Sequence, residues 1–99
     1  MVGSLEPVMT LASEIRDIVE QCVRGELGVH DMDRRLAAYV RKVAAAKDDV
    51  EARKLYGSAR LLDSEMGSGH RTEAQVRVEL ERVLAEVDAG SHTQATSRP

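Results

Sequence analysis

The sequence predicts an all-α fold, a small antiparallel four-helix bundle with a flexible C-terminal tail. Apolar residues recur at helical spacing in four segments, and the segments are joined by connections of about 4 to 7 residues. Aromatic residues make up only 2% of the 99-residue chain. Because sheets usually draw on aromatic and β-branched side chains, a core of Val, Leu, Ile, Met and Ala favours helices. We expect one domain over residues 1–89 and a disordered tail over residues 90–99.

The first two predicted helices cover residues 7–24 and 31–46. In the first, Pro7 suits the opening turn, Cys22 lies within the apolar arc, and Gly25 marks the end. In the second, acidic residues in the first turn favour the positive end of the helix dipole. Its predicted apolar side consists of Met32, Leu36, Tyr39, Val40 and Val43.

The third predicted helix covers residues 49–66, and the fourth follows the joint that ends at Thr72. Asp48 or Asp49 is expected to cap the third helix, and Gly57 is expected to mark a close helix crossing. The sequence Thr72-Glu73-Ala74-Gln75 fits a capping box, in which the first and fourth residues bond each other's backbone N–H groups. The predicted apolar stripes are Ala52, Leu55, Ala59, Leu62 and Met66, then Val76, Leu80, Val83, Leu84 and Val87.

Composition restricts the class of protein. The net charge of −3 argues against a general polyanion binder, and the single cysteine excludes an internal disulfide and fits a reducing compartment. No apolar run reaches the roughly 20 residues of a membrane span, and no secretory signal is evident. We therefore expect a cytoplasmic protein that does not use a membrane, and the abundance of Arg, Ala and Val suggests a bacterial or phage origin.

Two stretches contain residue types that could support chemistry. Asp63 and Glu65 stand near His70, but two residues on a helix differ by about 200° in direction, so the carboxylates do not converge. His30 and its neighbouring aspartates lack a second cluster that would complete a metal site. We predict no catalytic residues, no metal site and no cofactor, and read both stretches as helix ends.

Basic residues are unevenly distributed. Residues 31–60 hold eight basic and five acidic side chains, whereas residues 61–90 hold three and seven. Arg34, Arg35, Arg41 and Lys42 fall within about 120° on the second predicted helix and would form a ridge. The ridge could be a solvated face, a contact for an acidic protein, or a contact for nucleic acid. The nucleic-acid interpretation is weakened because no aromatic side chain accompanies the ridge for base stacking.

Some apolar residues point away from the predicted core. Val50 and Leu61 lie opposite the apolar stripe of the third helix, and Val78 does so on the fourth. They indicate a second contact surface, for another protein or a second copy, unless the helix phases are misassigned.

The segment "VRGELGVHDMDRRL", residues 23–36, is similar to the helix hairpins of small bacterial immunity proteins of the colicin type. The similarity covers only fourteen residues, and any helix hairpin could carry it, so it assigns no family. The sequence favours a non-catalytic module for protein–protein interaction, such as an immunity factor, an adaptor or a regulator. The alternative is a small nucleic-acid-associated regulator that uses the ridge.

Overall fold

The computed structural model describes residues 10–96, with side chains up to residue 89, and every regular element in this range is a helix. The helices are α1 (Leu11–Val23), α2 (Val29–Ala37), α3 (Val40–Ala45), α4 (Val50–Gly67) and α5 (Glu73–Thr96). The all-α prediction is confirmed, but the described part of the chain has five helices because the predicted second helix is divided. The predicted positions of Pro7 and of residues 97–99 lie outside the described residues.

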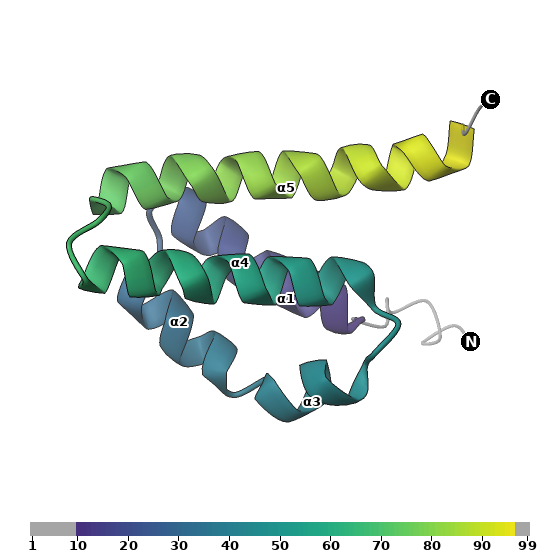
Figure 1. The fold of residues 1–99 in the computed structure, drawn as a ribbon, viewed down its shortest axis with the longest axis horizontal. Helices are drawn as coiled ribbons and strands as arrows, with labels where there is room; N and C mark the ends of the chain where they lie inside the picture. The colour runs from purple at the N-terminus through teal and green to yellow at the C-terminus, as the bar shows by residue number, and fades with distance from the viewer. Residues whose placement is uncertain (1–9, 97–99) are drawn as a thin grey trace, which may run out of the picture.

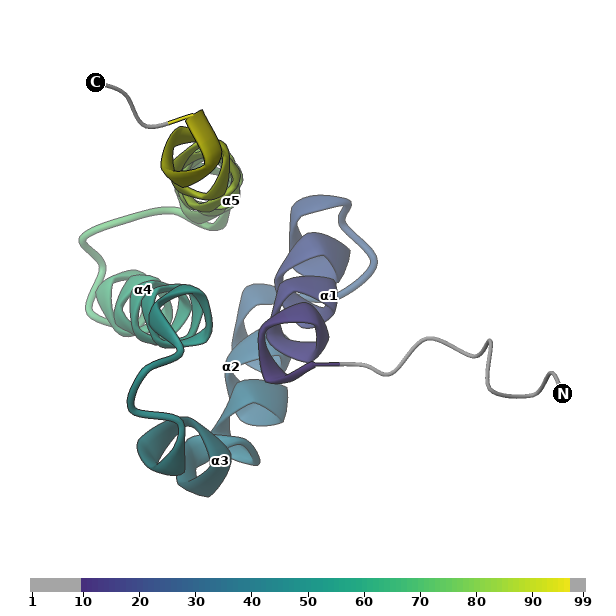
Figure 2. The ribbon, with the colours of Figure 1, turned by 90° about the vertical axis from the view of Figure 1, so that its right-hand side faces the viewer.

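The four longer helices enclose the core. Figure 1 shows α4 and α5 side by side and running in opposite directions, with α1 behind them and α2 beneath. Viewed along the long axis, α1, α2, α4 and α5 surround a shared interior, and α3 lies at the edge remote from α5 (Figure 2). The fully buried larger side chains come from all four of these helices: Ile15, Val19, Cys22, Val29, Met32, Leu36, Leu55, Val76 and Leu80.

The helix ends follow local rules that the sequence carries. Thr10 Oγ1 accepts a hydrogen bond from Ser13 N at the start of α1, and Asp49 Oδ1 accepts one from Ala52 N at the start of α4. Thr72 and Gln75 form the predicted capping box, with N···O distances of 2.9 and 3.1 Å. The connection between α4 and α5 is therefore a joint between two helices, as the sequence predicts.

The chain leaves α1 and α4 through glycines in the left-handed region. Gly25 has a φ of +81° and Gly69 a φ of +84°, which a residue with a Cβ adopts only at a cost. Gly57 has no such role, and no heavy atom lies within 4 Å of a Cβ built there. The predicted close helix crossing at Gly57 is wrong, because this residue is exposed on the outer side of α4.

The division of the predicted second helix is the main departure from expectation. Ala38 and Tyr39 form a turn in which the Tyr39 N–H bonds to the Leu36 carbonyl at 2.8 Å, an i to i+3 pattern tighter than that of an α-helix. The turn places the Tyr39 hydroxyl on Glu14 of α1 and leaves Val40 51% exposed. Val40 was expected in the core, so that part of the prediction is wrong.

The helix α5 extends further than expected. The periodic pattern ends at Ala89, but the helical backbone continues through Thr96 (Figure 1). The predicted flexibility of residues 90–99 stays a prediction. Among the described residues, no helix has both the length and the apolar character needed to cross a bilayer.

Candidate functional site

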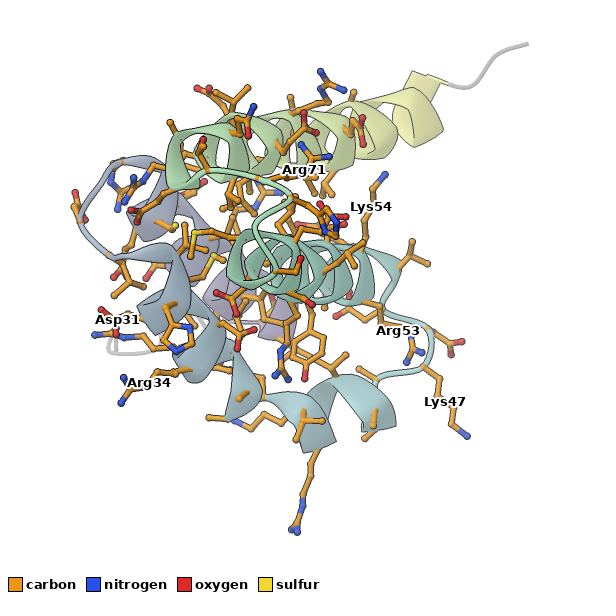
Figure 3. The ribbon with its side chains drawn as sticks, turned by 60° about the vertical axis from the view of Figure 1, so that its left-hand side comes forward. Asp31, Arg34, Lys47, Arg53, Lys54 and Arg71 are labelled. Atoms are coloured by element: carbon orange, nitrogen blue, oxygen red, sulfur yellow. The ribbon has the colours of Figure 1, made fainter. Side chains whose placement is uncertain are left out.

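The predicted basic ridge does not form one face of one helix. Arg34 and Arg35 lie on α2, Arg41 and Lys42 lie on α3, and the turn at Ala38 and Tyr39 separates the two pairs. Arg34 lies 3.7 Å from Asp31 on its own helix. Figure 3 shows both residues at the edge of α2. All four cations are exposed, as predicted. The prediction that they line one face of a single helix is wrong, because two helices carry them.

Most basic side chains elsewhere are matched by carboxylates. Arg16 of α1 bonds both Glu51 of α4 and Asp88 of α5 at 2.7 Å, and these contacts raise the pKa of its guanidinium despite partial burial. Lys54 lies 3.3 Å from Glu86, so it links α4 to α5. These pairs join the longer helices to one another.

The cations around α3 are different. Among the described residues, no carboxylate lies within ion-pair distance of Arg35, Arg41, Lys42, Lys47 or Arg53. Arg53 instead donates to the carbonyl of Val43 at 3.2 Å, and Lys42 lies 5.5 Å from the centroid of the Tyr39 ring. Lys47 lies in the connection between α3 and α4, and Arg53 lies in the first turn of α4 (Figure 3). The unmatched cations therefore gather at one end of the molecule.

Apolar side chains are exposed on the same segment of the chain as these cations. Val40 at the start of α3 is 51% exposed and Val50 at the start of α4 is 75% exposed. We define the α3 surface as Val40, Arg41, Lys42, Lys47, Val50 and Arg53. Sequence reasoning missed Val40, Lys47 and Arg53, because it placed Val40 in the core and treated the ridge as a single helix face.

The other predicted apolar residues lie on the longer helices. Leu61 of α4 is 59% exposed and Val78 of α5 is 60% exposed, so the predicted helix phases there are confirmed. Val78 borders a shallow depression of about 300 Å³ together with Arg71, Ala74, Gln75 and Glu79. These residues do not belong to the α3 surface, since α3 and α5 lie at opposite edges (Figure 2).

The acidic and histidine side chains that could support chemistry contact different partners. Asp63 faces α2, where its Oδ1 lies 3.5 Å from His30 Nδ1, while Glu65 pairs with Arg71 in the joint. His70 contacts the hydroxyl of Ser68 at 2.8 Å. Within the described residues, no group of three or more His, Cys, Asp or Glu side chains is placed to hold a metal ion.

A partly buried polar contact connects distant parts of the chain. Cys22 is fully buried, and burial raises the pKa of its thiol. Its carbonyl accepts a hydrogen bond of 2.8 Å from Arg77, which also pairs with Glu73. Glu73 in turn accepts the N–H of Val29, so the first residue of α5 supplies the cap that Gly28 cannot give to α2.

No protein-family model, no curated protein and no solved structure matches this chain.

Proposed function

We propose that the chain is an antiparallel four-helix bundle with α3 as an added segment, and that it acts as a non-catalytic protein-binding module. The observation that carries this proposal is the α3 surface, where α3 and the start of α4 carry both exposed valines and cations that have no carboxylate partner among the described residues. Desolvated apolar side chains supply much of the energy of a protein interface, and charges at its rim set the rate of association. An acidic protein segment that carries an aliphatic side chain would match this surface.

The proposed setting is the cytoplasm of a bacterium, or a phage that infects one. An immunity factor, an adaptor and a regulator all act by binding, and each needs a stable body with one accessible contact surface. The longer helices supply the body, because their ion pairs and core residues connect α1, α2, α4 and α5. The α3 segment supplies the surface.

A second candidate function uses the same cations. Lys and Arg without carboxylate partners could neutralise phosphates, which would make the chain a small nucleic-acid-associated regulator. The exposed valines favour the protein partner, since phosphate contacts do not require them. The two candidates therefore differ in what Val40 and Val50 contribute.

The test compares three variants in two assays. Arg41→Glu/Lys42→Glu changes the charge of the α3 surface, Val40→Asp/Val50→Asp changes its apolar part, and Arg24→Glu/Arg82→Glu is a control with the same change in net charge elsewhere. Each is used as bait for bacterial lysate proteins and tested for binding to mixed-sequence DNA and RNA at low salt. We expect a stoichiometric protein partner that is lost with both α3 variants and kept with the control.

Other results would change the assignment. Nucleic-acid binding that falls steeply with salt and is lost only in Arg41→Glu/Lys42→Glu would establish the second candidate in place of the first. Capture that is unaffected by either α3 variant would overturn the proposal that this surface is the binding site.

A further inference from the structure

A groove of about 580 Å³ lies between α1 and the turn that joins α2 to α3. Its α1 side includes Glu14, Asp17 and Ile18, and its other side includes Arg35, Ala38 and Tyr39. The Tyr39 hydroxyl donates to Glu14 Oε1 at 2.9 Å and connects the two sides. Burial and this hydrogen bond raise the pKa of Tyr39, so the hydroxyl keeps its proton at neutral pH. The groove lies beside the α3 surface but has a different chemical character.

The groove carries unmatched charges of both signs. Within the described residues, Glu14 and Asp17 have no basic partner within ion-pair distance, and Arg35 has no acidic one. In the part of the chain that the structure describes, Asp17 accepts a hydrogen bond only from Gln21 on its own helix, at 2.9 Å. The carboxylates and the guanidinium line the same groove, but they do not reach each other. An occupant that satisfies them must present a cation to α1 and an anion to α2.

This requirement disfavours the partners considered for the α3 surface. A nucleic acid or a uniformly acidic segment would meet Arg35 favourably but would be repelled by the carboxylates of α1. Like charges brought together at an interface weaken binding. The groove therefore matches an occupant of mixed charge, with an apolar part that covers Ala38 and the exposed part of Tyr39.

We propose that the groove is the contact surface between two copies of this chain related by a two-fold axis. In an isologous contact, residue i of one copy meets residue j of the other, and residue j of the first meets residue i of the second. Arg35 then faces Asp17 of the second copy, and Asp17 faces its Arg35, so one arrangement forms this ion pair twice. Glu14 keeps its hydrogen bond from the Tyr39 hydroxyl. The turn at Ala38 and Tyr39 lines the same groove, so the second copy would cover it. This contact goes beyond the proposed function, since it does not use the α3 surface.

The test is the mass of the full chain in solution, measured by light scattering over a range of protein concentration and salt. We expect a mass that rises above the monomer value of 10.9 kDa as concentration increases and falls as salt screens the ion pairs. Asp17→Arg and Arg35→Asp each place like charges across the two-fold axis, so each should raise the dissociation constant by about tenfold or more. Both residues are exposed, and thermal melts should show that both variants fold.

Mixing the variants gives the decisive result. Asp17→Arg mixed with Arg35→Asp should form a heterodimer, because each cation then meets an anion, and the double variant D17R/R35D should form a homodimer again. Arg24→Asp, which changes an exposed cation outside the groove, should leave the mass unchanged.

A monomer at all concentrations in low salt would overturn this proposal. So would a dimer that persists in both single variants, or one that neither mixing nor the double variant restores. None of these results bears on the protein-binding function, which is tested separately by the variants of the α3 surface.

Discussion

The α3 segment and the body formed by the other helices are held together in different ways. In the body, each helix buries several side chains, and ion pairs such as Arg16 with Glu51 and Asp88 connect helices distant in sequence. In α3, only Val43 is buried, and the further attachments are the bond from Arg53 to the Val43 carbonyl and the bond from Tyr39 to Glu14. A helix of six residues is too short to be stable by itself. Stability and accessible surface are therefore found in different parts of the molecule.

The largest expected effect concerns the body. Leu36→Ala and Leu80→Ala each remove a side chain that is at most 1% exposed, and each should lower the free energy of unfolding by about 2 to 5 kcal/mol. Such a loss is a large part of the stability of a small domain. Thermal and urea unfolding followed by circular dichroism would measure it. Wild-type stability in both variants would contradict the core assigned here.

A smaller effect concerns the joint between α4 and α5. Thr72→Ala removes the acceptor of the Gln75 N–H and should cost about 1 kcal/mol in the free energy of unfolding. His70→Ala, in the same connection, serves as the control and should leave the unfolding curve unchanged, since His70 is exposed. Equal losses in the two variants would show that the joint, rather than the cap, is sensitive to substitution.

The smallest effect concerns α3 itself. Tyr39→Phe removes the hydrogen bond to Glu14 at a partly exposed position and should lower global stability by about 0.5 kcal/mol. Because this bond is one of the few attachments of α3, hydrogen exchange should accelerate at the amides of residues 40–45 and change little in α4. Uniform acceleration through both helices would show that α3 and the body unfold as one unit.

The parts of the fold that were predictable depend on local chemistry. The apolar stripes of α1, α4 and α5, the cap at Asp49 and the capping box at Thr72 all follow from side chains within one or two helical turns. The outward positions of Val50, Leu61 and Val78 follow from the same periodicity and are confirmed by their exposure. Local periodicity is therefore sufficient to predict which face of most helices is buried and which is exposed.

The remaining features depend on contacts distant in sequence. Ala37 and Ala38 are strong helix formers, so nothing local predicts the break before Tyr39, and the contact that accompanies it comes from Glu14 on another helix. The cap of α2 by Glu73 is likewise a contact across 44 residues. The predicted ridge is wrong for the same reason. The prediction continued one helical periodicity through Ala38 and Tyr39, where contacts distant in sequence support a turn.

The reaction of the buried Cys22 thiol can report when α1 separates from the neighbouring helices. A disulfide reagent can react only after α1 has moved away from its neighbours, because Cys22 is fully buried and burial disfavours the thiolate. At low reagent concentration, the rate of modification therefore measures the fraction of molecules in which the body is open. At high reagent concentration, it measures the rate at which the body opens. Since the chain has a single cysteine, the signal comes from one position. The kinetics of α1 can thus be followed without an engineered label.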